Sequence, residues 1–80
     1  MSKVLYSKQA QKFLLLQENK LAMLIREKIL LLPKGDVKRL IGNATPPLYR
    51  LRIGKIRVVY CRDEGNIKVI KIDYRGDIYK

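Results

Sequence analysis

Three arginines flank a short turn in the last third of the chain: Arg50, Arg52 and Arg57. Apolar and basic residues alternate over residues 49–53, as in a half-buried β-strand, and residues 56–62 are predicted to be the return strand. Gly54-Lys55 lies between the two segments, and glycine in the first position is typical of a two-residue type II′ hairpin turn. This register predicts that Arg52 faces Arg57 directly and that Arg50 lies on the same face of the sheet.

An arginine cluster of this kind favours phosphate as a ligand. Like charges directly opposite each other on a sheet are unfavourable by up to ~1 kcal/mol, so stability alone does not explain the cluster. A phosphate between the side chains would remove the repulsion, and the planar guanidinium group suits a phosphate better than an ammonium group does. We therefore predict a phosphate-binding site that comprises Arg50, Arg52, Arg57 and the turn residue Lys55. The alternative is a solvated basic face on which the side chains stay apart.

The net charge also favours a polyanionic partner. The chain has 18 basic and 7 acidic residues, a net charge of +11. Such an excess on a small chain points first to nucleic acid, and next to an acidic protein or a membrane surface. Residues 48–62 contain five basic residues and no acidic one, so the binding face is expected there.

The composition excludes several kinds of chemistry. The chain has no histidine, which excludes a histidine general base, a Ser-His dyad and the usual zinc sites, and we expect neither metal nor cofactor. Its one cysteine, Cys61, cannot form an internal disulfide and is expected to be a small buried residue. No apolar stretch approaches the roughly 20 residues of a membrane span. We expect a soluble, cytoplasmic chain that forms a single domain over residues 1–80.

The first half of the chain predicts one strand and two helices. Residues 4–6 form a short β-like run, and Ser7 can cap a helix over residues 8–17. Asn19 can cap a second helix, which Pro33 and Gly35 end. The short link between them predicts an antiparallel helical hairpin. Residues 34–47 are predicted to be a connecting loop.

The second half predicts a β-meander of residues 49–53, 56–62 and 67–73. The element order is therefore β-α-α-β-β-β, an α+β fold with the helical hairpin packed on one face of a small antiparallel sheet. Regular pairing across the turn at residues 63–66 puts Arg62 opposite Ile67, Val59 opposite Ile70 and Arg57 opposite Ile72. Ile70 and Ile72 are therefore predicted to share a face with the arginines.

Three motifs in this order resemble the RelE/ParE toxin superfamily. The segment Tyr49-Arg50-Leu51-Arg52-Ile53-Gly54-Lys55-Ile56-Arg57-Val58-Val59-Tyr60 is similar to the central strand pair of these toxins. Tyr74-Arg75-Gly76-Asp77-Ile78-Tyr79 resembles their closing motif, and Val37-Lys38-Arg39-Leu40-Ile41-Gly42 resembles the loop before the strands. With the two helices, the resemblance covers nearly the whole chain.

The resemblance implies a toxin of a type II toxin–antitoxin system, whose partner is an acidic antitoxin. RelE-like members cut messenger RNA at the ribosome, without metal, by attack of the 2′-hydroxyl on the adjacent phosphorus. Arg50 and Arg52 match the family's basic first-strand positions, Arg57 its phosphate-binding arginine, Arg75 its late arginine and Tyr79 its C-terminal tyrosine. Clustered cations would stabilise the phosphorane, and they would favour the phenolate that a tyrosine general base requires.

Two other functions remain open. A ParE-like toxin would share the fold but inhibit DNA gyrase, and a basic RNA-binding module would hold phosphates without cutting. Only the nuclease needs Arg75 and Tyr79 together, and Tyr79 could also be an ordinary amphipathic tyrosine. Arginine does not readily release a proton, so neither Arg50 nor Arg52 can protonate the leaving 5′-oxygen. The sequence does not identify the group that does.

Overall fold

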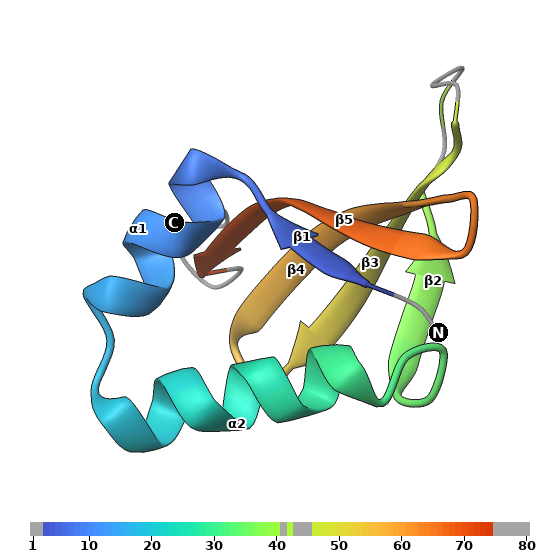
Figure 1. Cartoon of the computed structure of the whole chain (residues 1–80). Helices are drawn as coiled ribbons and strands as arrows, with labels where there is room; N and C mark the ends of the chain where they lie inside the picture. Colours follow the sequence, from blue (N-terminus) through green and yellow to red (C-terminus); the bar gives the residue numbers. More distant parts are fainter. Residues whose placement is uncertain (1–2, 41, 43–45, 75–80) are drawn as a thin grey trace.

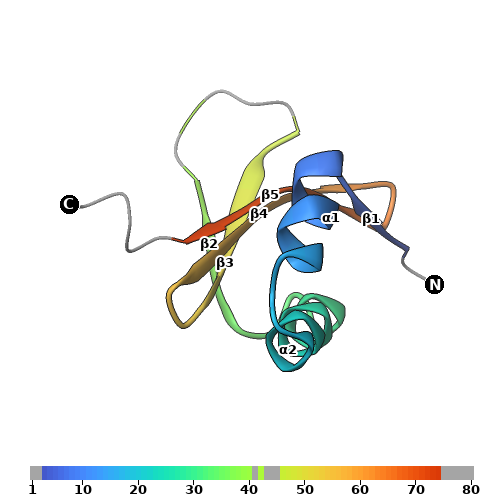
Figure 2. The same cartoon turned by 90° about the vertical axis from the view of Figure 1, so that its left-hand side faces the viewer.

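A computed structural model describes residues 3–40, 42 and 46–74 of the chain. The elements within these residues are β1 (Val4–Tyr6), α1 (Lys8–Leu15), α2 (Asn19–Leu30), β2 (Asp36–Arg39), β3 (Leu48–Ile53), β4 (Ile56–Asp63) and β5 (Asn66–Tyr74). The described strands form one five-stranded sheet in the order β1-β5-β4-β3-β2 (Figure 1). Figure 2 shows both helices on one side of this sheet, which confirms the predicted α+β architecture.

The sheet differs from the prediction at both of its edges. β1 pairs with β5 in parallel, so the sheet is mixed rather than wholly antiparallel. The two strands are far apart in the sequence, and a long connection with helices permits parallel pairing. At the other edge, β2 lies within the predicted loop and pairs antiparallel with β3. Its sequence, Asp36-Val37-Lys38-Arg39, has a single apolar residue, which is too few for alternation to reveal a strand.

The two helices run in different directions rather than antiparallel (Figure 1, Figure 2). Ser7 caps α1 as predicted, since its hydroxyl accepts a hydrogen bond from the backbone N–H of Ala10 at 3.1 Å. Asn19 is the first residue of α2 rather than its cap. α1 packs mainly on β5, whereas α2 contacts β3, because each helix turns its own apolar stripe to the sheet. Neither of the described helices has the length and apolarity to cross a membrane.

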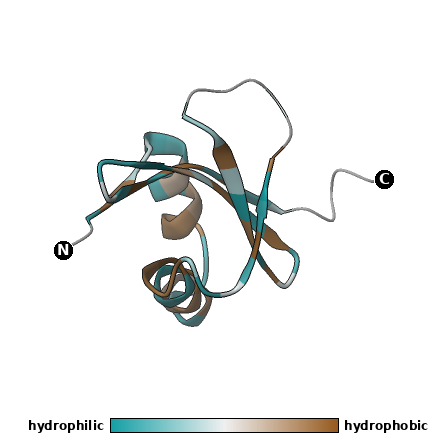
Figure 3. Ribbon diagram, turned by 90° about the vertical axis from the view of Figure 1, so that its right-hand side faces the viewer, coloured by the Kyte–Doolittle hydropathy of each residue, from teal (hydrophilic) through white to brown (hydrophobic). Residues whose placement is uncertain are grey.

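The hydrophobic core lies between the helices and the sheet. Along the described helices and strands, polar and apolar residues alternate (Figure 3). The buried core residues are Ala10, Leu14, Ile25, Ile29, Leu51, Ile56, Val58, Tyr60, Ile67, Val69 and Ile72. Every one of the strand residues among them faces the helices, so this face of the sheet is apolar and is covered.

A β-bulge interrupts the pairing of β4 with β5. Arg62 faces Ile67 as predicted, but the register shifts between Val59 and Tyr60, so that Val59 faces Lys71 and Arg57 faces Asp73. The predictions that Val59 faces Ile70 and that Arg57 faces Ile72 are therefore wrong. One extra residue in β5 exchanges the faces of the residues that follow it. Ile72 is consequently buried against the helices, while Lys71 and Asp73 lie on the opposite face.

The start of α1 holds β5 at and beyond the bulge. The backbone N–H of Ser7 bonds to the carbonyl of Val69 at 2.9 Å, and its hydroxyl donates to the carbonyl of Ile70 at 2.6 Å. The side-chain amide of Gln9 donates to the carbonyl of Ile72 at 2.8 Å and accepts from its N–H at 2.9 Å. Because β1 ends at Tyr6, these groups satisfy the edge of β5 that β1 does not reach.

Candidate functional site

The turn between β3 and β4 has the predicted geometry. Of its two central residues, only Gly54 has a positive φ, +58°, as a type II′ turn requires. Arg52 faces Arg57, as predicted, and Leu51 faces Val58. Because Leu51 and Val58 are buried under the helices, the arginines lie on the side of the sheet that faces away from both described helices. We call this side, which carries Arg50, Arg52 and Arg57, the arginine face.

A row of four charged residues crosses the arginine face. The row has one residue from each of β2, β3, β4 and β5, paired in register. These residues are Asp36, Arg52, Arg57 and Asp73, and we call them the charged row. The sequence did not lead us to these two aspartates, since β2 was predicted as a loop and the bulge was not anticipated. They relieve the repulsion between the two arginines, so the cluster is stable without a bound phosphate.

Asp73 fixes the orientation of Arg57. The Nε and Nη2 atoms of Arg57 donate to the two carboxylate oxygens of Asp73 at 3.3 and 3.0 Å. The pair is partly accessible, with side-chain exposures of 26% and 22%. A guanidinium group has five N–H donors in one plane, so the remaining donors of Arg57, including both on Nη1, are available to an external oxygen. The guanidinium plane is thus oriented before any ligand arrives.

Arg50 and Arg52 share a single carboxylate. Arg50 Nη1 lies 3.6 Å from one oxygen of Asp36, and Arg52 Nε lies 4.0 Å from the other. Both distances are too long for hydrogen bonds, and neither nitrogen has a hydrogen-bond partner within the described part of the chain although both are shielded from solvent. Two guanidinium groups thus share one carboxylate, and the positive charge that remains favours an anion such as phosphate.

Two lysines add to the positive charge of the arginine face. Lys38 on β2 faces Arg50, and Lys71 on β5 faces Val59. The ammonium group of Lys71 lies 3.6 Å from the Asp73 oxygen that also accepts from Arg57. With these lysines, five cations lie around the two carboxylates of the charged row, so the net charge of this part of the face attracts anions.

Of the three other predicted site residues, the structure describes one, Lys55. Lys55 is exposed in the turn at the end of the arginine face. Arg75 and Tyr79 lie outside the described residues. Tyr74, the last residue of β5, has its ring 5.3 Å from that of Phe13 and donates a hydrogen bond to Gln17 at 2.6 Å. It therefore packs against α1.

At the end of β4 that is farther from the Gly54 turn, the arginine face carries a buried thiol and an ion-paired lysine. Cys61 is buried there, as predicted, and is a free thiol. Lys68 lies across from it and forms an ion pair with Asp63 at 3.1 Å. The hydrogen bond to Asp63, with its negative charge, raises the pKa of Lys68. Lys68 is thus paired with Asp63 and takes no part in the charged row.

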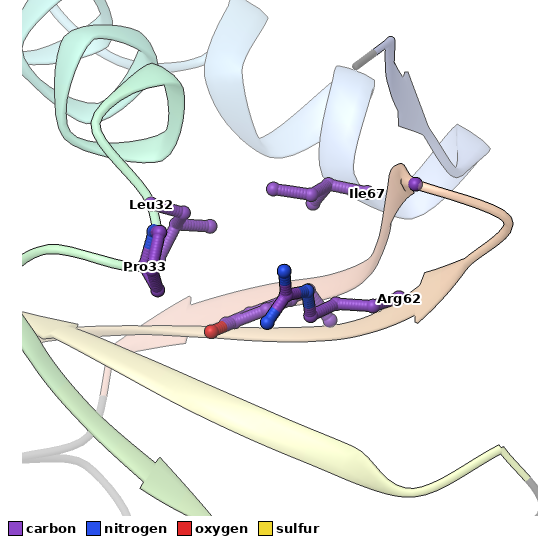
Figure 4. A pocket seen from close by; sticks show the side chains of 6 residues that line it. Leu32, Pro33, Arg62 and Ile67 are labelled. Atoms are coloured by element: carbon purple, nitrogen blue, oxygen red, sulfur yellow. The ribbon is translucent and has the colours of Figure 1, made fainter. Parts of the chain in front are cut away.

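A small pocket on the helix side of the sheet is not part of this arrangement. Its volume is about 50 Å³, and it lies between the end of α2 and the β4–β5 hairpin (Figure 4). The side chain of Arg62 extends into it toward Leu32 and Pro33 (Figure 4). Tyr60 also lines it, and burial raises the pKa of this phenol. The described residues contain no cluster of three or more His, Cys, Asp or Glu side chains that could bind a metal.

Comparison with solved structures identifies the fold. A chain of the RelB–RelE antitoxin–toxin complex from Methanococcus jannaschii matches with a TM-score of 0.73 and 23% identity over 94% of both chains. A chain of the archaeal RelE–RelB complex from Pyrococcus horikoshii OT3 matches with a TM-score of 0.63 and 27% identity over 94% of this chain and 96% of the other. No family model matches the sequence, and a search of curated proteins finds no match. The chain therefore has the fold of RelE-like toxins, as its motifs predicted.

Proposed function

We propose that this chain is the toxin of a type II toxin–antitoxin system and that it cuts messenger RNA at the ribosome without a metal. The RelE-like fold supports the first part, since both structural neighbours come from RelE–RelB complexes. One observation carries the second part. Three arginines lie together on the face of the sheet that points away from both described helices, and Asp73 holds one of them, Arg57, in a fixed orientation.

The proposed reaction begins with attack of a 2′-hydroxyl on the neighbouring phosphorus. The bond to the 5′-oxygen then breaks, which leaves a 2′,3′-cyclic phosphate and a 5′-hydroxyl. Negative charge accumulates on the phosphorane, and fixed cations that need no reorganisation stabilise it. Arg57, oriented by Asp73, clamps the phosphate, and the positive charges of Arg50 and Arg52 on the same face attract its other oxygens.

The remaining roles rest on the sequence resemblance. Arg75 supplies a further cation, and Tyr79 accepts the proton of the 2′-hydroxyl as general base. Lys55 in the exposed turn contacts a neighbouring phosphate of the RNA. The partner in the resting cell is an acidic antitoxin segment, which a chain of net charge +11 attracts rapidly and whose binding weakens with salt.

The test is to incubate the purified protein with RNA, with and without ribosomes, and to map the ends of the products. Arg57→Ala should lower the cleavage rate by about 10²- to 10³-fold, as expected for the loss of a group that stabilises the developing charge. RNA affinity should fall only slightly, because many cations share phosphate binding. Lys12→Ala on α1 removes the same charge far from the arginine face and should leave cleavage unchanged.

The same experiment separates the alternatives. Tyr79→Phe should lower cleavage by about 10²- to 10⁴-fold, and full activity of this variant would refute Tyr79 as the base. RNA binding without any cleavage would leave a non-catalytic RNA-binding module. Inhibition of DNA gyrase supercoiling by a protein that cuts no RNA would indicate the ParE-like function instead.

A further inference from the structure

The bulge in β5 puts a lysine on the arginine face. In a regular strand Lys71 would share the face of Val69, which is buried under the helices. With Ile70 as the extra residue, Lys71 faces Val59 on the arginine face instead. The hydrogen bonds from Ser7 to Val69 and Ile70 hold this conformation. The orientation of Lys71 is thus a defined feature of the fold.

Lys71 and Arg57 meet at one oxygen atom. Oδ2 of Asp73 lies 3.0 Å from Arg57 Nη2 and 3.6 Å from Lys71 Nζ. The ammonium group is therefore next to the guanidinium that clamps the phosphate in the proposed function. The Lys71 side chain is 55% exposed, so a bound RNA strand can reach it.

The reaction needs a proton donor that the arginines cannot supply. The departing 5′-oxygen must be protonated, and arginine does not give up its proton in proteins. The two aspartates of the charged row are ion-paired with arginines as carboxylates, so they do not serve as proton donors. Lys38 and Lys71 remain, and Lys38 lies on the edge strand β2, opposite Arg50 rather than beside Arg57. Of the described side chains on this face, Lys71 alone has a transferable proton and also contacts Asp73, the partner of Arg57.

We propose that Lys71 is a catalytic residue, the general acid that protonates the leaving 5′-oxygen of the RNA; this rests on the proposed ribonuclease function. As the bond between phosphorus and the 5′-oxygen breaks, its electron pair stays on the oxygen, which takes a proton from the Lys71 ammonium group. The proton of the 2′-hydroxyl goes to the general base. Lys71 is left as a neutral amine and regains its proton from water.

Two substitutions separate proton transfer from charge. Lys71→Arg keeps the positive charge but removes the transferable proton, and Lys71→Met removes both. Both variants should cleave about 10²- to 10⁴-fold more slowly, and Lys71→Arg should bind RNA nearly as well as the parent protein. The matched control is Lys68→Arg on the same strand and face, whose native ammonium group pairs with Asp63 and whose cleavage should be unaffected.

A substrate with sulfur in place of the 5′-bridging oxygen makes the test decisive. A thiolate leaves without protonation, because a thiol is far more acidic than an alcohol. At the mapped cleavage site of the RNA that the parent protein cuts, Lys71→Arg should therefore cleave the sulfur substrate within a few-fold of the parent rate. Normal cleavage of the oxygen substrate by Lys71→Arg would overturn the inference, as would an equal loss on both substrates. If the parent protein cuts no RNA, the proposed function fails, and the inference with it.

Discussion

Two neighbouring rows of side chains cross the same four strands and face opposite ways. The charged row stands on the arginine face, and the next row, Val37, Leu51, Val58 and Ile72, faces the helices. We call the second one the apolar row. Since successive residues of a strand point to opposite faces, a single set of strands carries both rows. The residues that stabilise the fold and the residues proposed to act on RNA therefore lie on opposite sides of the sheet. Substitutions in the apolar row should mainly affect stability, and substitutions in the charged row should mainly affect activity.

The two rows also depend in the same way on the bulge in β5. The β3–β4 half of each row follows from the Gly54 turn, which is a local feature. The β5 member of each row, Ile72 or Asp73, follows from the extra residue Ile70 and from contacts with α1. Substitutions in either row, or at the bulge that determines the β5 member of both rows, therefore test the comparison directly.

The largest effect is expected from Ile72→Ala in the apolar row. Ile72 is 0% exposed, and truncation of a buried isoleucine costs about 2–5 kcal/mol of unfolding free energy. Ile70→Ala, at a residue that is 42% exposed, should cost less than about half of that, because less apolar surface is buried. Urea unfolding measures both values. Similar, small losses for the two variants would mean that β5 has no bulge, because a regular strand puts both residues on the arginine face.

In the charged row, Asp73→Asn should affect turnover more than stability. The variant loses the carboxylate that orients Arg57, and loss of alignment should lower kcat about 10- to 100-fold. RNA affinity should increase, since a negative charge disappears from the phosphate-binding face. Single-turnover cleavage and RNA binding measure the two effects. A variant with unchanged turnover and unchanged affinity would show that the Asp73 pair has no part in the site.

A smaller effect is expected from Gln9→Ala, which releases the edge of β5 beyond β1. The variant loses two hydrogen bonds to Ile72, at about 0.5–1.5 kcal/mol each. Gln11→Ala, the matched control on the same helix, loses one exposed bond to Tyr6 and should cost less. Amide hydrogen exchange should accelerate at Ile72 in the Gln9 variant only. Equal exchange in both variants would argue against a role for Gln9 in holding this edge.

The smallest effect concerns the pH dependence of stability at Tyr60, on the helix side of the sheet. Burial raises the pKa of this phenol above its ordinary value of 10.0. A raised pKa in the folded state gives stability that is fully present below the unfolded pKa and is lost as pH rises through the folded pKa. Tyr60→Phe should therefore weaken the loss of stability above about pH 10. Identical slopes for the variant and the parent chain in alkaline unfolding would contradict this.

The sequence predicted the parts of the site that depend on local chemistry. The turn at Gly54 and the alternation on either side of it were sufficient to put Arg50, Arg52 and Arg57 on one face. The Ser7 cap was predicted for the same reason, because a cap involves only neighbouring residues. Arg75 and Tyr79 lie outside the described residues, so their roles remain predictions.

The features that the sequence did not reveal depend on distant contacts. β2 exists because it pairs with β3, and this pairing brings Asp36 to the arginines. The bulge depends on α1, which is distant in the sequence and which binds β5 through Ser7 and Gln9. One signal was present: the apolar residues of β5 change from odd to even positions after Val69, a phase break that indicates an extra residue.

The hydrogen bonds from Ser7 and Gln9 to β5 also bear on self-association. An open strand edge is a template on which another chain can pair, and such pairing leads to aggregation. Here β1 covers the start of β5, and α1 side chains occupy its backbone groups at Ile70 and Ile72. The opposite edge is the short strand β2, which carries Lys38 and Arg39. Copies of this chain would meet at that edge as like charges, so the sheet resists growth into multi-chain β-structure at both of its ends.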